Sequence, residues 1–151
     1  MKETTCLGKD IIMIRAFKAE DLNDVMNIWL TTNIQAHDFI SKDYWINHFE
    51  MVQEVLPTAE VYVYEEGEIK GFIGVTDGYI AGLFVLTTEQ SKGIGKQLLD
   101  FVKTKYNKLI LTVYEKNIRA TRFYKNQDFV MTHTSIETAT NEVELHMTWE
   151  I

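Results

Sequence analysis

The sequence predicts an α/β protein of the α+β kind, with a single mixed central sheet of about seven strands flanked by about four helices. Apolar residues recur every third or fourth position in some segments and every second position in others, as helices and half-buried strands require. The run Leu109–Val113 is apolar without alternation, which indicates a strand covered on both faces. The expected order is a strand, two helices, three strands, a helix, a strand, a helix and two strands.

The first half of the chain opens with a strand over residues 11–16 and continues with two helices. The first helix follows Asp21, and its apolar residues fall three or four positions apart: Leu22, Val25, Met26, Trp29 and Leu30. A loop is expected around residues 33–39. Ser41 has a side chain suited to capping the second helix, and Pro57 ends that helix.

The second half changes to strand patterns. Strands are expected over residues 61–64, 69–76, 79–85 and 109–113, and two further strands close the chain. Asp77 and Gly78 form a tight hairpin signal between the second and third of these strands. A glycine-bearing loop then leads into a helix that runs to about Lys105. Asn117 can cap the last helix, because its side-chain oxygen accepts from free backbone N–H groups.

Composition favours one ordered domain. Of the 151 residues, 46% are hydrophobic and 25% charged, and no apolar run approaches the roughly 20 residues that cross a bilayer. Residues 1–12 mix charged and polar side chains and lack the apolar core of a signal peptide. We interpret them as a dispensable extension before a domain over 13–151, and we expect a cytoplasmic protein. Cys6, the single cysteine, is interpreted as an incidental thiol.

Charge is unevenly spread along the chain. Between residues 90 and 125, nine basic residues face only two acidic ones, so this window carries +7 while the whole chain carries −7, which leaves −14 elsewhere. The basic residues are Lys92, Lys96, Lys103, Lys105, Lys108, Lys116, Arg119, Arg122 and Lys125. This basic window suggests one locally bound anion, although amphipathic helices that simply expose lysines explain it equally well. Nucleic acid is disfavoured, since the acidic remainder would repel a long polyanion.

The segment from Gln90 to Lys96 lies between a strand and a helix. Its glycines allow close backbone approach, and the free N–H groups at the helix start favour an anion such as a phosphate. A tight strand-to-helix turn is the alternative reading. A Walker A loop would need glycine at Gln90 and serine or threonine at Gln97, and a dinucleotide fingerprint would need glycine or alanine at Leu98. Both patterns therefore fail.

From about Met13 to Trp149 the sequence resembles the GNAT acetyltransferase superfamily. That family carries Gln/Arg-x-x-Gly-x-Gly/Ala after its fourth strand, and a second signature on the following strand and helix. The residues that match these two motifs are Gln90, Gly93, Gly95, Asn117, Ala120, Phe123, Tyr124 and Phe129. The chain departs from the family at Thr87, Ser91 and Asp128. Asp128 stands where the family has glycine, and aspartate tolerates the left-handed conformation better than most residues.

The resemblance implies an N-acetyltransferase that moves an acetyl group from acetyl-CoA to a primary amine by direct attack in a ternary complex. It also implies that a backbone N–H near Phe84 or Val85 holds the thioester carbonyl and that Gly82 marks a bulge beside it. The implied acetyl-CoA-binding residues are Phe84, Val85, Gln90, Ser91, Lys92, Gly93, Ile94, Gly95, Lys96, Asn117, Ala120, Phe123 and Tyr124. Tyr124 is the expected general acid, with packing of the helix face as its alternative role.

The acceptor side is less defined. The resemblance places the acceptor near the loop that carries His37, Asp38 and Phe39, and Tyr79 is a further candidate there. His37 is one candidate general base, since its ordinary pKa suits proton transfer, and Glu115 is the other. The acidic remainder suggests a cationic acceptor, either a small-molecule amine or an amine of a peptide or protein.

No metal site is expected, because the histidines lack metal-ligand spacing. Neither a nucleic acid nor a membrane partner is expected, given the acidic remainder and the lack of a long apolar run. A monomer or a homodimer is consistent with the sequence. The alternative function is a non-catalytic acyl-CoA-binding regulatory module on the same fold.

Overall fold

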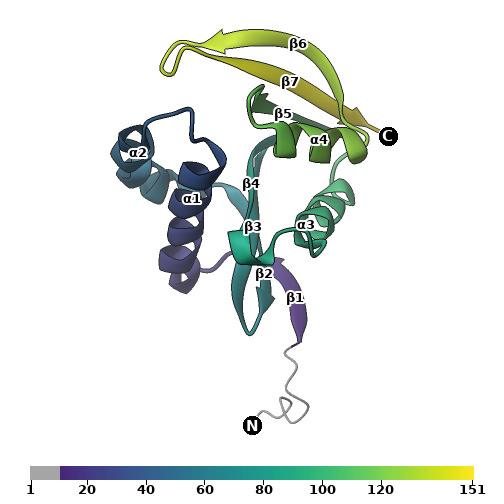
Figure 1. Ribbon diagram of the computed structural model, residues 1–151. Coiled ribbons are helices and arrows are strands. Elements are labelled where there is room, and N and C mark those ends of the chain that lie inside the picture. Colours follow the sequence, from purple (N-terminus) through teal and green to yellow (C-terminus); the bar gives the residue numbers. More distant parts are fainter. Residues whose placement is uncertain (1–10) are drawn as a thin grey trace.

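A computed structural model describes residues 11–151 of the chain. Seven strands form one mixed sheet in the order β1-β2-β3-β4-β5-β7-β6, and four helices flank it (Figure 1). The strands are β1 (Ile12–Ala16), β2 (Glu60–Glu66), β3 (Glu68–Thr76), β4 (Tyr79–Val85), β5 (Lys108–Tyr114), β6 (Val130–Glu137) and β7 (Glu142–Glu150). The helices are α1 (Leu22–Ala36), α2 (Lys42–Val55), α3 (Ile94–Lys103) and α4 (Ile118–Asn126). The predicted fold class is confirmed.

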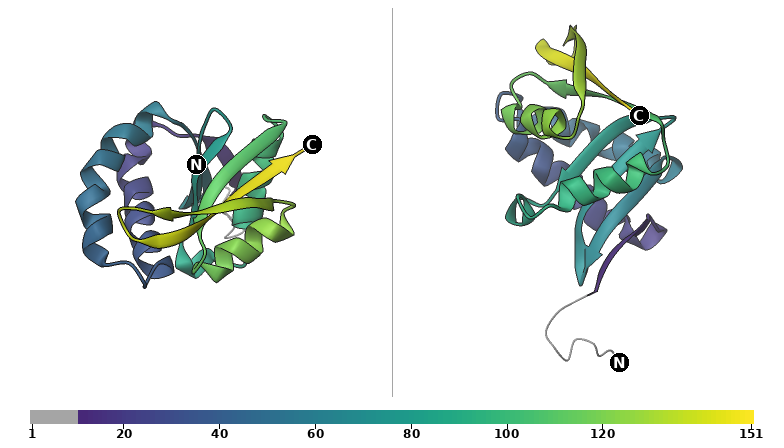
Figure 2. Two further views of the ribbon diagram at one scale, coloured as in Figure 1. Left: turned by 90° about the horizontal axis from the view of Figure 1, so that it is seen from above. Right: turned by 90° about the vertical axis from the view of Figure 1, so that its right-hand side faces the viewer.

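The sheet separates two hydrophobic cores. Phe72 on β3 faces α1 and α2, whereas the next residue, Ile73, faces α3 and α4. This alternation follows from the pleat of a strand, which sends successive side chains to opposite faces. The two helix pairs lie on opposite sides of the sheet when it is viewed from above (Figure 2).

Helix α1 is longer than the sequence predicts. It runs to Ala36, so the loop expected over residues 33–39 is wrong in its first four positions. Thr32 donates from its hydroxyl to the Ile28 carbonyl, and the Asn33 side chain donates to the Trp29 carbonyl at 2.9 Å. Because carbonyl groups of the preceding helical turn accept these hydrogen bonds, both polar side chains can be buried while the segment stays helical.

The first strand begins at Ile12, inside the segment that we interpret as an extension. Residues 1–10 of that segment, including Cys6, lie outside the described residues. Ile12 pairs with Glu66 at the end of β2, so the first strand begins within one residue of its predicted start at residue 11.

Local backbone signals read from the sequence correspond to real turns. Asp77 and Gly78 both have positive φ angles, of 50° and 81°, as the hairpin between β3 and β4 requires. Asp128 has φ of 71°, which confirms that it occupies a left-handed position. Ser41 caps α2 by accepting from the Asp43 amide, as predicted.

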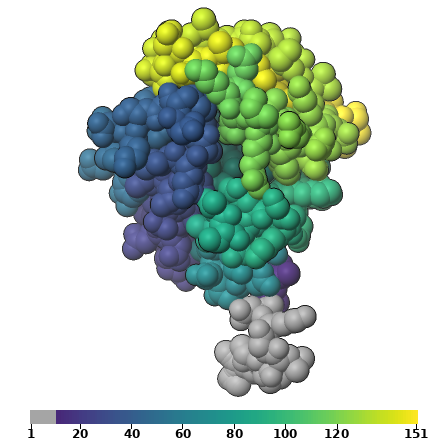
Figure 3. All heavy atoms as spheres, viewed as in Figure 1, coloured from purple at the N-terminus to yellow at the C-terminus, as the bar shows by residue number. Residues whose placement is uncertain are grey.

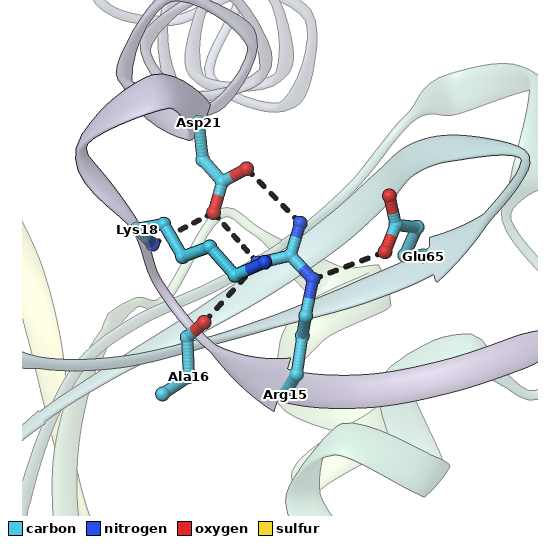
Figure 4. Close-up of polar contacts among 5 residues, drawn as sticks. All are labelled: Arg15, Ala16, Lys18, Asp21 and Glu65. Carbon is cyan, nitrogen blue, oxygen red and sulfur yellow. Dashed lines mark hydrogen bonds and ion pairs between the residues drawn. The ribbon is translucent and has the colours of Figure 1, made fainter.

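An ion-pair network centred on Arg15 ties the first strand to its neighbours (Figure 4). The Arg15 guanidinium donates to both carboxylate oxygens of Asp21, at 2.8 and 3.0 Å, and to Glu65 on β2 at 3.0 Å. Asp21 also accepts from the Lys18 amide at 2.7 Å. The arginine lowers the pKa of Asp21, which is 4% exposed, so the network holds a buried charge pair where the chain enters α1.

Asp21→Asn is expected to lower the free energy of unfolding by about 2–3 kcal/mol at neutral pH, because it leaves Arg15 without its charged partner. Urea denaturation measures this loss. The difference from wild type should shrink as the pH falls through the lowered pKa of Asp21, since the wild-type carboxyl then also loses its charge. Glu20→Gln, at the exposed neighbouring position, is the control, and equal losses in both variants would contradict the argument.

Candidate active site

A cavity of about 400 Å³ opens where β4 and β5 separate. Within residues 11–151 these parallel strands pair only at Tyr79–Ile110 and Ile80–Leu111, so the rest of β4 diverges from its neighbour. Helix α1, the segment after β4 and helix α4 meet on the face of the molecule shown in Figure 3. The cavity is lined by Thr32, Asn33, Ala36, His37, Leu83, Phe84, Val85, Glu89, Gln90, Ser91, Gly93, Ile94, Gly95, Lys96, Asn117, Arg119, Ala120, Phe123 and Tyr124.

The free edge of β4 presents a backbone donor to this cavity. The Leu86 amide donates to the Lys70 carbonyl on the β3 side at 2.9 Å. Since successive amides of a strand point to opposite edges, the Val85 amide faces the side where β5 has diverged. The Gln90 side chain reaches the Val85 carbonyl on that side at 3.0 Å. Of the two predicted hydrogen-bond donors, the Phe84 and Val85 amides, it is therefore the Val85 amide that points toward the cavity.

The glycine loop exposes the start of α3. Gly93 has φ of 86° and precedes the first helical residue, and as the N-cap residue it has no side chain with which to cap the helix. The first amides of α3 are therefore available to a ligand, and the partial positive charge of the helix start favours an anion. A Cβ built on Gly95 would lie 3.5 Å from the Phe123 ring, an ordinary contact distance, so Gly95 lies beside the α4 side chain that lines the same cavity.

Two cationic side chains lie beside the glycine loop at one end of the cavity. Lys96 and Arg119 line it, and Arg119 donates to the Ser91 hydroxyl at 2.9 Å, which joins α4 to the glycine loop. Lys96 also pairs with Asp100 at 2.7 Å, and other residues of the basic window have structural contacts as well. Lys103 donates to the Gln127 carbonyl and lies over the Trp149 ring. Of the basic window, Lys96 and Arg119 therefore line the cavity, and an anion site stays a prediction.

Helix α4 brings Tyr124 into the cavity wall. The Asn117 side chain caps this helix by accepting from the Ala120 amide at 3.2 Å, as predicted. Tyr124 follows two turns later, is 8% exposed and packs between Phe123 and Phe129. Burial raises the pKa of Tyr124, so its hydroxyl is protonated at neutral pH, the state that a proton donor needs.

His37 lies at the other wall, directly after α1. Its ring stacks on Trp45 with centroids 5.1 Å apart and meets the edges of Phe39 and Tyr114. Burial among these rings lowers the pKa of His37, so the imidazole is neutral at pH 7.

The structure gathers most of the predicted site residues. Every residue predicted to bind the acyl donor lines the cavity except Lys92, which is exposed and pairs with Glu89. His37 lines it as well. Asp38 and Glu115 are exposed and do not line the cavity. Phe39 does not line it either, but its ring contacts the ring of His37, which does.

Tyr79 lies at the start of β4, whereas the cavity is built on the last residues of that strand, so Tyr79 is not part of this site. Sequence reasoning also missed several lining residues: Thr32, Asn33, Ala36, Leu83, Glu89 and Arg119. Of these, only Arg119 carried a signal, as a member of the basic window. The α1 residues were missed because the helix was expected to end before its last turn.

Metal binding and membrane crossing can be judged for residues 11–151, the part of the chain that the structure describes. In that part of the chain, no three histidine, cysteine, aspartate or glutamate side chains are grouped so as to hold a metal ion. Among the same residues, no helix combines the length and the apolar character that crossing a bilayer requires.

Known proteins share both the sequence and the fold. Residues 32–151 match the family model described as an acetyltransferase (GNAT) domain. The peptidyl-lysine N-acetyltransferase YiaC of Escherichia coli (strain K12) is 31% identical over 142 residues, which cover 92% of this chain and 97% of that protein.

Two solved structures extend the likeness to three dimensions. The apo-form of YjaB from Escherichia coli matches with a TM-score of 0.82 and 24% identity, over 92% of this chain and 97% of that chain. The PaiA N-acetyltransferase of Thermoplasma acidophilum, solved in complex with coenzyme A, has a TM-score of 0.77 and 17% identity, over 93% and 99% of the two chains. At these identities the structures support the fold alone. The family match and the identity to YiaC show that this chain belongs to the GNAT family and is an acetyltransferase.

Proposed function

We propose that the protein transfers the acetyl group of acetyl-CoA to the side-chain amine of a lysine in a peptide or protein. The observation that carries the proposal is the convergence of three features on one cavity: the open start of α3, the Val85 amide and buried Tyr124. The printed name of YiaC, a peptidyl-lysine N-acetyltransferase, supports the choice of acceptor.

The cavity suits the acyl donor at both ends. The amides at the start of α3, together with Lys96 and Arg119, provide donors and positive charge for the pyrophosphate. The Val85 N–H is placed to donate a hydrogen bond to the thioester carbonyl oxygen. A fixed hydrogen-bond donor there stabilises the negative charge that develops on this oxygen during attack by a few kcal/mol. The donor supplies an acetyl group already activated as a thioester.

Gly82 gives the divergent end of β4 its shape. The register between β3 and β4 shifts just after the Gly74–Gly82 pair. A Cβ built on Gly82 would lie 2.2 Å from the Phe84 ring, so the absence of a side chain lets that ring fold back along the strand. Phe84 also packs on Phe72, with ring centroids 5.0 Å apart, and it lines the cavity. Gly82 therefore supports the cavity wall beside the proposed thioester position.

Tyr124 is the proposed general acid. In the reaction the neutral lysine nitrogen bonds to the acetyl carbon, the carbon–sulfur bond breaks, and the thiolate takes a proton from the Tyr124 hydroxyl. The amine loses one proton to water, and Tyr124 regains one from solvent, so the step balances. Burial raises the pKa of Tyr124, and a thiolate that forms in the same buried site has the pKa of its conjugate acid raised for the same reason, so the phenol can donate to it when the two are in contact.

An acidic aromatic surface next to the cavity suits a cationic acceptor. Tyr114 donates to Glu137, and Thr140 donates to the same carboxylate at 2.8 Å. Glu144 is opposite Tyr114 in the β5–β7 pair, and burial together with the charge of Glu137 raises the pKa of Glu144. Because the Tyr114 ring lies 5.2 Å from that of His37, this surface adjoins the cavity wall. A lysine approaching here would relieve the repulsion between the two carboxylates.

A peptide with one internal lysine and a blocked N-terminus should be acetylated in the presence of acetyl-CoA, and turnover should fall as salt rises, since the attraction is electrostatic. Mass spectrometry of the peptide and the release of free thiol measure the reaction. The same peptide with arginine in place of lysine is the control. Tight coenzyme A binding without turnover on any amine would instead indicate a regulatory binding module.

Tyr124→Phe should lower kcat about 100-fold, which is typical for the loss of a general acid. The dissociation constant for coenzyme A should change less than threefold, because the ring that packs in the wall is retained. Steady-state kinetics and calorimetry give the two values. Tyr79→Phe, outside the cavity, is the control, and unchanged turnover in Tyr124→Phe would show that the tyrosine is only a packing residue.

Gly82→Ala should weaken coenzyme A binding about tenfold or more, because the new methyl group displaces the Phe84 ring. Calorimetry measures the affinity. Gly74→Ala is a matched control, since Gly74 is the cross-strand partner and its added Cβ would make only an ordinary contact, 3.8 Å from Val61. Equal affinities in the two variants would contradict a role for the Phe84 position.

A further inference from the structure

One polar bridge joins the two sides of the cavity. His37 follows the last residue of α1, and its Nδ1 lies 3.0 Å from the Asn33 carbonyl oxygen within that helix. Its Nε2 lies 3.2 Å from Nδ2 of Asn117, the residue that caps α4. Helices α1 and α4 pack on opposite faces of the sheet, so this contact spans the opening between β4 and β5 (Figures 1 and 2).

The partners of His37 determine which tautomer is present. A carbonyl oxygen can only accept, so Nδ1 of His37 carries the proton and donates to Asn33. The Asn117 oxygen already accepts from the Ala120 amide, so the group that faces His37 is the Asn117 NH₂. Nε2 of His37 must therefore accept from it. Both ring nitrogens of the neutral imidazole are then paired, and the lone pair that a general base would use is already engaged.

The surrounding rings hold the imidazole in this orientation. Trp45 from α2 stacks on it with an interplanar angle of 27°, while Phe39 and Tyr114 meet it edge-on at angles of 84° and 74°. Three different elements thus fix the plane of the ring. Rotating Nε2 away from Asn117 to receive a proton would cost both the hydrogen bond and the stacking contact.

We propose that His37 is a positioning residue, which holds the start of α4 against the end of α1, and that it does not abstract the proton of the acceptor amine. Asn117, Arg119, Ala120, Phe123 and Tyr124 all reach the cavity from this start or from the helix that follows it. The bridge therefore sets the width of the cavity and the place of Tyr124 relative to the β4 edge. The inference rests on the proposed function for the role of Tyr124, whereas the bridge itself does not.

Three variants separate positioning from base catalysis. His37→Ala removes the bridge, and His37→Gln places an amide oxygen where it can accept from Asn117 but cannot act as a base. Asn117→Ser keeps a good helix cap but is too short to reach His37. His37→Ala should weaken coenzyme A binding about fivefold and lower kcat about tenfold, and Asn117→Ser should do the same. His37→Gln should retain at least a third of the wild-type kcat and nearly the full affinity.

The double variant His37→Ala/Asn117→Ser tests the coupling directly. If both residues act through one bridge, the double variant should be little worse than either single variant, in affinity and in kcat. His133→Ala, on the exposed edge strand β6, is the control for an unrelated histidine. The ¹⁵N shifts of the His37 ring should show a protonated Nδ1 and an Nε2 that accepts a hydrogen bond.

Base catalysis predicts a different pattern, which would overturn the proposal. His37→Gln and His37→Ala would then lose turnover alike, by 100-fold or more, with unchanged coenzyme A affinity. Additive effects in the double variant would also overturn it. If the wild-type protein acetylates no amine, the proposed function fails, but the affinities and the ring shifts still test the bridge.

Discussion

The divergence of β5 from β4 is the constraint on which the rest of the structure depends. After two paired positions the parallel ladder ends, and among the described residues the last part of β4 keeps backbone ladder pairing on its β3 side, while the Gln90 side chain reaches the Val85 carbonyl on the other side. Unpaired backbone groups buried in a sheet are costly, so this edge requires a polar ligand or solvent. The parts of the proposed site all lie around that opening. The Val85 amide lies on its β4 edge, α3 begins at one end of it, and α4, which follows β5, lies along its other side.

The two ends of the cavity differ in charge. Lys96, Arg119 and the start of α3 bring positive charge to the end proposed for the acyl donor, whereas Glu137 and Glu144 bring negative charge to the surface proposed for the acceptor. An anionic donor and a cationic acceptor would thus be drawn to separate ends of one cavity. The His37–Asn117 bridge lies between these ends, and the Arg15 network secures the opposite end of the sheet, where α1 begins.

Predictions succeeded where a residue's own backbone decides the outcome. Asp128 and the Asp77–Gly78 turn have the positive φ angles that their sequence context indicates, and Ser41 and Asn117 cap the helices that follow them. The prediction of a loop failed at Asn33, whose polar side chain is satisfied inside its own helix by the Trp29 carbonyl. Asn33 belongs to a helix and lines the cavity, although its neighbours suggest a loop. Tyr79 and Glu115 were chosen by chemistry, and neither lines the cavity.

The sequence by itself determined the family, the order of elements and the loop that suits the acyl donor, because these depend on residue type and short-range spacing. Only the tertiary structure decided what each polar group faces. It selected Val85 over Phe84 as the β4 donor, through the direction of strand amides. It also placed His37 against Asn117, 80 positions later in the chain, and so gave a candidate base an occupied lone pair. Such a contact depends on packing across the sheet, which no local pattern encodes.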